Sequence, residues 1–173
     1  DWKNSGDQLV YANRSQPNKA GSRFWDLYTA TLSDSSGVST WQAIKGTVGL
    51  STPVPSGFGR LTQDGRAAHP QYSPDEEHIV FVHNAGGSNN IAVLDLKTEE
   101  IRYLTGLDDG TQIHTPDWSP DGRRIAFSIF TPDGDRSIGV IPSAGGDWEY
   151  LVSSDATDRD PRWTENGTGL IFS

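Results

Sequence analysis

The chain has 173 residues, enough for one domain with a sizeable core, and its lack of cysteine excludes disulfides, thiolate metal sites and cysteine catalysis. Its net charge of −9 argues against a nucleic-acid groove, which needs a basic surface, and against an anionic membrane surface. The apolar runs are much shorter than the roughly 20 residues that span a bilayer, so no membrane insertion is expected. Nineteen glycines and ten prolines, spread along the chain, indicate many turns between short strands.

One motif occurs four times without gaps, at residues 1–11, 71–81, 117–127 and 162–172. An aromatic residue holds its second position in every copy: Trp2, Tyr72, Trp118 and Trp163. Each copy ends in an aliphatic stretch closed by an aromatic, and three copies follow a proline at the same place. The last two intervals between the aromatics are 46 and 45 residues, which matches a propeller blade period of roughly 40–50; the first interval is 70.

The turn inside the motif is read most easily in the third copy, Ser119-Pro120-Asp121-Gly122. Proline presets φ for a type I turn, and glycine takes the left-handed conformation that follows. The second copy has Glu76 where glycine is expected. A positive φ would cost this residue about 1 kcal/mol, so we expect its turn to have a different shape.

Two more strands follow each motif. The third strands are predicted at residues 27–30, 91–94 and 138–141, and the fourth strands near 61–62, 103–105 and 150–152. Four antiparallel strands per repeat make an all-β, β-propeller blade. Residues 1–173 are therefore predicted to form a single partial propeller domain, with a long excursion at about 33–59. A second register would make Trp41–Ile44 the fourth strand of the first blade and place the excursion after it.

The phase of the repeat predicts that the ring is incomplete within this chain. Two blades have all four strands, a third lacks its innermost strand, and the last copy supplies one hairpin, so about three to four blades are present. The two ends overlap in phase and cannot complete one blade together. We therefore expect a fragment of a larger ring, or a chain that assembles with another chain.

The motif resembles the TolB-type propeller repeat, a proline followed by Trp-Ser-Pro-Asp-Gly and an apolar strand. Residues 116–122 match this signature fully; the second copy has Tyr72 for Trp and Glu76 for Gly, and the other copies are looser. The resemblance implies a ring of commonly six or more blades in a bacterial envelope or secreted protein. Similar blades occur in prolyl-oligopeptidase-like peptidases and in some pectin-fragment lyases.

Residues that lead into the innermost strand are the best site candidates, because these line the channel mouth in propellers. His69, His114 and Asp160 come close to equivalent positions on successive blades, with Arg159 and Asp158 beside the last of them. Two imidazoles and a carboxylate could hold a divalent cation. No other cofactor is expected. Because no tight ligand spacing exists, the favoured interpretation is that His69, His114 and Asp160 are polar residues of a wet channel or loop, each hydrogen-bonded locally.

The loops before these residues are acidic and belong to the same connection of each blade: Asp64, Asp108, Asp109, Asp155 and Asp158. They are expected on one face, where they could bind a cation or contact a basic protein surface. Aspartate is also common in turns for purely structural reasons.

No G-x-S-x-G elbow, H-E-x-x-H motif or phosphate-binding glycine loop occurs in the chain. The sequence therefore favours a non-catalytic, protein-binding scaffold of TolB-like type in the bacterial periplasm or outside the cell. The alternative is the propeller portion of an enzyme, either a prolyl-oligopeptidase-like serine peptidase or a metal-dependent carbohydrate lyase.

Overall fold

The computed structural model describes residues 1–4, 8–14, 17, 22, 24–31, 58–63, 66–153 and 159–173. The secondary structure of these residues consists of β-strands in antiparallel sheets. Within the same ranges, no helix has the length and apolarity needed to cross a membrane.

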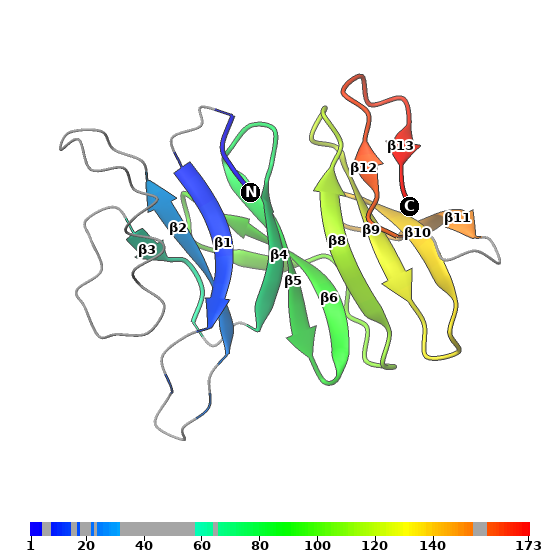
Figure 1. Ribbon diagram of the computed structural model, residues 1–173, viewed down its shortest axis with the longest axis horizontal. Coiled ribbons are helices and arrows are strands. Elements are labelled where there is room, and N and C mark those ends of the chain that lie inside the picture. Colours follow the sequence, from blue (N-terminus) through cyan, green and yellow to red (C-terminus); the bar gives the residue numbers. More distant parts are fainter. Residues whose placement is uncertain are drawn as a thin grey trace.

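The strands form four sheets, each a meander in chain order (Figure 1). The first sheet contains β1 (Gln8–Arg14), β2 (Trp25–Thr31) and β3 (Phe58–Arg60). The second contains β4 (Ala67–Tyr72), β5 (His78–Ala85), β6 (Ser88–Asp95) and β7 (Ile101–Tyr103). The third contains β8 (Gln112–Trp118), β9 (Arg124–Phe130), β10 (Arg136–Pro142) and β11 (Glu149–Ser153). The last contains β12 (Arg162–Trp163) and β13 (Leu170–Ile171).

This arrangement confirms the predicted blades: two four-stranded sheets, one three-stranded sheet and one terminal hairpin. In the first blade, β3 pairs with β2 and begins a few residues before the predicted strand. The Leu61 N–H donates to the Leu27 carbonyl at 2.8 Å and extends this pairing toward the expected position. The excursion predicted at 33–59 lies outside the described residues except for its last two, as does the alternative strand at 41–44.

Both faces of the central blades are buried, which explains the continuous apolar runs in their middle strands. Ile79 and Phe81 pack in a cluster that includes Val10 and Leu27 of the first blade, whereas Val80, between them, packs in a cluster with residues of the third blade. Successive side chains of a strand point to opposite faces, so one strand supplies two cores. Blade-to-blade packing is therefore the source of the apolar core.

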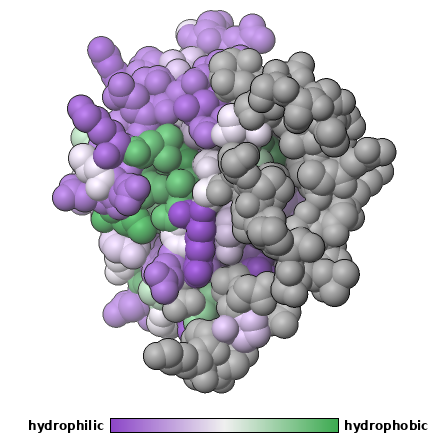
Figure 2. Space-filling model, turned by 90° about the vertical axis from the view of Figure 1, so that its left-hand side faces the viewer, coloured by the Kyte–Doolittle hydropathy of each residue, from purple (hydrophilic) through white to green (hydrophobic). Residues whose placement is uncertain are grey.

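Two motif aromatics lie inside these clusters. Tyr72 packs between the first and second blades, and Trp118 packs between the second and third. Figure 2 shows the side of the molecule that carries the first blade, where the described residues are mostly hydrophilic around an apolar patch.

The expectation of a different turn at Glu76 is wrong. Glu76 has a φ of 60°, close to the 70° of Gly122 and the 68° of Gly167 at the equivalent positions. Its Oε1 accepts a hydrogen bond of 2.6 Å from the Asn4 N–H of the neighbouring blade. This contact lies at the surface, where solvent weakens it, and it offsets part of the conformational cost of the positive φ.

Candidate functional site

A β-bulge interrupts the innermost strand just before the motif. The pairing register shifts between Ala68 and Gln71 in β4, and between His114 and Asp117 in β8. A bulge bends a strand and re-aims its side chains, and bulges are common beside functional sites.

Three residues at equivalent positions adopt the same left-handed backbone, with φ of 50° at His69 and 46° at Thr115, within the two bulges, and 53° at Asp160, before β12. Each directly precedes a proline, a position that normally favours extended backbone. Such strain costs on the order of 1–3 kcal/mol per residue and is concentrated at functional positions. The equivalent residues are therefore His69, Thr115 and Asp160, and His114 lies one residue earlier in its blade.

The structure brings two of the predicted site residues together. The rings of His69 and His114 meet edge to face, with their centroids 5.8 Å apart. The Phe130 ring meets His114 in the same geometry, with a centroid distance of 5.3 Å. Neither imidazole forms a hydrogen bond with any residue that the structure describes. Both are therefore available to a ligand.

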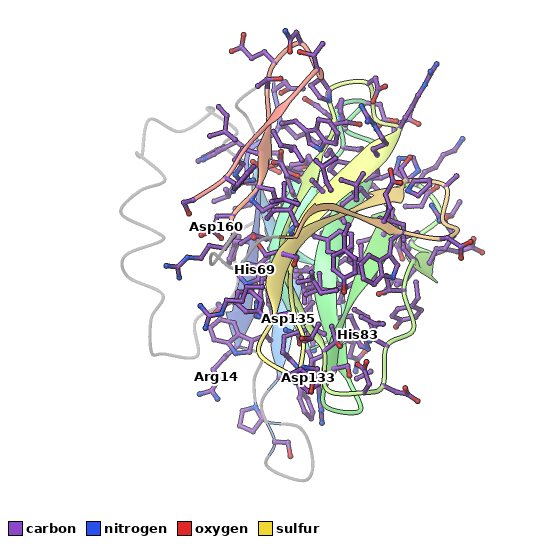
Figure 3. The ribbon with its side chains drawn as sticks, turned by 90° about the vertical axis from the view of Figure 1, so that its right-hand side faces the viewer. Arg14, His69, His83, Asp133, Asp135 and Asp160 are labelled. Carbon is purple, nitrogen blue, oxygen red and sulfur yellow. The ribbon has the colours of Figure 1, made fainter. Side chains whose placement is uncertain are left out.

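Burial lowers the pKa of His69 below its ordinary value of 6.5, and Arg162 lowers it further, while the Asp160 carboxylate acts in the opposite direction. Burial also lowers the pKa of His114, His69 lowers it further, and the Asp160 carboxylate acts in the opposite direction with a smaller effect. Both imidazoles are consequently neutral at pH 7. Asp160 is close enough to act on the two rings, and Figure 3 shows it beside His69.

Two cavities meet at His69. The first, of about 330 Å³, is lined by Phe24, Trp25, Arg66, Ala68, His69, Val82, Asn84, Asn89 and His114. The second, of about 250 Å³, is lined by Asp1, His69, Pro70, Gln71, Thr115, Pro116 and Arg162. The innermost strands thus line two adjoining cavities, the first (called the channel mouth below) mainly aromatic and amide and the second more polar.

The remaining predicted residues are only partly brought to this mouth. The Asp160 N–H donates to the Ser128 hydroxyl at 2.8 Å, which fixes its backbone. Arg159 is exposed and pairs through its backbone with Ser173, and Asp158 lies outside the described residues. Among the residues that are described, no group of three or more His, Cys, Asp or Glu side chains is arranged to hold a metal ion. A divalent cation at His69, His114 and Asp160 stays a prediction.

The acidic loops are described in part. Asp108 and Asp109 are exposed, whereas Asp64, Asp155 and Asp158 fall outside the described residues. Hydrogen bonds from Thr111 lower the pKa of Asp109, so this carboxylate shapes its turn as well as adding surface charge. The hairpin between β9 and β10 adds two more exposed carboxylates, Asp133 and Asp135, which lie below His69 in Figure 3.

A second repeated feature was missed by sequence reasoning. The residue before each motif aromatic accepts a hydrogen bond from the aromatic's N–H in the next blade: Asp1 from Tyr72 at 2.9 Å, Gln71 from Trp118 at 2.9 Å and Asp117 from Trp163 at 2.7 Å. A polar residue at this position in every copy was the available signal. These bonds join adjacent blades around the channel and hold its lining in place.

The repeated sheets, the blade-to-blade cores and the shared channel define a β-propeller. The family described as "TolB beta propeller domain" matches residues 60–173, and the chain belongs to this family. A protein named Tol-Pal system protein TolB from Hydrogenovibrio crunogenus is 32% identical over 98 residues, which cover 56% of this chain and 21% of that protein. The aligned region is thus about a fifth of the relative's length.

Solved structures agree on the fold. A putative TolB from Agrobacterium tumefaciens superposes with a TM-score of 0.66 at 19% identity, over 99% of this chain and 57% of that one. Two enzymes also superpose, each with a TM-score of 0.63. They are an oligogalacturonate lyase from Vibrio parahaemolyticus (14% identity, 94% of this chain, 40% of that one) and a Pyrococcus horikoshii acylaminoacyl peptidase (17%, 100% and 27%). These likenesses establish the fold alone.

Proposed function

We propose that this protein is a non-catalytic, protein-binding propeller of the TolB type that works in the bacterial periplasm. The observation that carries the proposal is the family match over residues 60–173, together with a relative named as a Tol-Pal system protein at 32% identity. Its partner is then a protein of the same system in its own organism. The enzymes, by contrast, share only the fold, at 14% and 17% identity.

The docking face in this proposal is the end of the blades where the innermost strands begin, here called the lower end because it lies at the bottom of Figure 1. It comprises residues 85–88, 104–111 and 131–135 and opens into the channel mouth. Its exposed carboxylates, Asp108, Asp109, Asp133 and Asp135, suit a basic partner surface, since complementary charge speeds association and fixes orientation. Blades joined by partly buried hydrogen bonds present this face with little reorganisation, which favours affinity.

Site-specific photo-crosslinking in living cells tests the proposal. A photoreactive amino acid at Asn84, in the wall of the channel mouth, is expected to capture a Tol-Pal protein from the periplasm. The same amino acid at Glu77, an exposed residue of the motif turn at the opposite end, serves as the control. Equal capture from both positions, or capture from neither, would count against the proposed face. Cell fractionation that places the protein in the cytoplasm would overturn the proposed location.

A further inference from the structure

The larger cavity lies where three blades meet. Its walls come from Ala68 and His69 of β4, from residues of β5 and β6, from His114 of β8, and from Phe24 and Trp25 at the start of β2. Its volume of about 330 Å³ falls in the size range of small-ligand sites. It therefore has the dimensions for a compact organic molecule.

Arg66 gives the cavity its charge. It is the one charged side chain among the lining residues that the structure describes, since both imidazoles are neutral at pH 7. Its guanidinium lies over the Phe24 ring, 4.9 Å from the centroid, and forms no ion pair with a described residue. A guanidinium without an ion pair to any described residue is suited to an anion, and its planar fork matches a carboxylate.

The backbone holds this arginine in an unfavourable conformation. Arg66 has a φ of 43° and His69 a φ of 50°, so two of the lining residues are non-glycine residues in the left-handed region. The Arg66 carbonyl accepts a hydrogen bond from the Asn84 N–H at 3.2 Å, which ties it to β5. Strain of this kind persists where the surrounding structure enforces it, and it is concentrated in ligand sites.

The polar walls are partly fixed and partly free. Asn84 Nδ2 donates to Asn89 Oδ1 at 2.8 Å, and Asn89 Nδ2 donates to the Ile113 carbonyl at 3.3 Å, so both amides are oriented. The imidazoles of His69 and His114 form no hydrogen bond in the described part of the chain and can each donate one. Asp160 belongs to the fourth blade and does not line this cavity, although its charge reaches both imidazoles; Arg66 therefore supplies the positive charge that an anion needs.

An aromatic surface completes the cavity. Trp25 is 49% exposed although it lies in a strand, and it lines the cavity beside Phe24 and Val82. An exposed indole presents a flat apolar face with a polar N–H at its edge. It can pack against a ring or another compact apolar body.

We propose that this cavity binds a small organic carboxylate, with the carboxylate on Arg66, hydroxyl or amide groups on the two imidazoles, and the body of the ligand against Trp25. The site needs no protein partner, so it goes beyond the proposed scaffold function. A sugar acid and a peptide-like carboxylate share this chemistry, and the experiment separates them.

Calorimetric titration of the full-length protein provides the test, with two acids and their neutral counterparts: glucuronate against glucuronamide, and N-acetylphenylalanine against its amide. At least one acid is expected to bind saturably, and its neutral counterpart roughly tenfold more weakly or not at all. Binding of glucuronate alone identifies a sugar-acid site, and binding of N-acetylphenylalanine alone a peptide-like one. Arg66→Gln should weaken binding by roughly tenfold or more, and Arg66→Lys by less, because lysine keeps the charge without the fork.

The matched control is Arg124→Gln, which removes another arginine that stacks on an aromatic ring, 4.4 Å from the Trp163 centroid and away from the cavity. It should leave binding unchanged. If Arg66→Gln fails to fold, Asn84→Asp decides, because a new carboxylate in the wall should weaken binding by a similar factor. No binding of either acid, equal binding of the neutral counterparts, or binding insensitive to the cavity variants would overturn the proposal. Partner capture in cells is scored separately from these titrations, so a failure of ligand binding leaves the scaffold proposal standing.

Discussion

Replacing Asp117 by asparagine tests whether hydrogen bonds around the channel hold the blades together. The Asp117 side chain is almost fully buried, and its carboxylate accepts three bonds of 2.7 Å from groups on both sides. The donors are Gln71 Nε2, Arg162 Nη1 and the Trp163 N–H. Asparagine has nearly the same shape as aspartate but only one acceptor oxygen. Its NH₂ group would face one of the three donors, so at least one hydrogen bond would be lost.

The size of the effect follows from these contacts. A hydrogen bond to a charged group contributes about 1.5–3 kcal/mol, and a buried donor left without a partner adds about 1–3 kcal/mol. The Arg162 side chain is 59% exposed, so its ion pair is discounted to below about 1 kcal/mol. Asp117→Asn should therefore lower the free energy of unfolding by about 3 kcal/mol, or Tm by roughly 10 °C for a domain of this size.

Urea unfolding of the full-length protein, followed by circular dichroism, measures this difference. The control is Asp135→Asn, the same chemical change at an exposed hairpin residue, which should alter the free energy of unfolding by less than about 0.5 kcal/mol. A loss at Asp117 that does not exceed the loss at Asp135 would refute the role of this carboxylate in joining the blades.

Three further changes test other parts of the structure. Gly139→Ala should cost about 1–3 kcal/mol of unfolding free energy, because the added Cβ would lie 2.6 Å from the Phe127 ring; unchanged urea unfolding would contradict this packing. Gly122→Ala should lower the free energy of unfolding by about 1 kcal/mol because of its φ of 70°. The added Cβ would clash with nothing, since the nearest heavy atom is 4.0 Å away, so the whole cost comes from the backbone. A variant as stable as the wild type would show that the turn relaxes. The pKa values of His69 and His114 are lower in the folded protein than in the unfolded chain. As the pH falls through about 6.5, the unfolded chain therefore binds more protons than the folded protein, and the free energy of unfolding decreases. A His69→Gln, His114→Gln double variant should lose less stability between pH 7 and pH 5 (about the range in which histidine titrates), and identical pH profiles would contradict the burial argument.

The blades could be predicted from the sequence because their determinants are local. Apolar stretches, turn residues and a regular interval place each strand without knowledge of distant contacts, as the agreement at β6 and β10 illustrates. The turn at Glu76 was predicted wrongly because the bond that supports it comes from Asn4, far away in the sequence.

The site was less predictable for a similar reason. A left-handed residue before proline contradicts local preference, so nothing in the sequence near His69 or Asp160 indicates this backbone. Counting back from the motif aromatic gives Thr115 as the third equivalent residue, but its hydroxyl is not a usual metal ligand, so the titratable neighbour His114 was predicted instead. Arg66 was missed because its importance depends on a cavity formed by three blades.

The most direct test of the central claim is a titration of the full-length protein with the purified Tol-Pal proteins of its own organism. We expect one of them to bind with a Kd in the micromolar range or tighter, at about −8 kcal/mol or below. An Asp133→Lys, Asp135→Lys double variant at the lower end should weaken this binding, whereas a Glu77→Lys, Glu100→Lys double variant at the opposite end should not. No binding to any of these proteins, or equal loss in both variants, would contradict a TolB-type scaffold that docks its partner at the channel mouth.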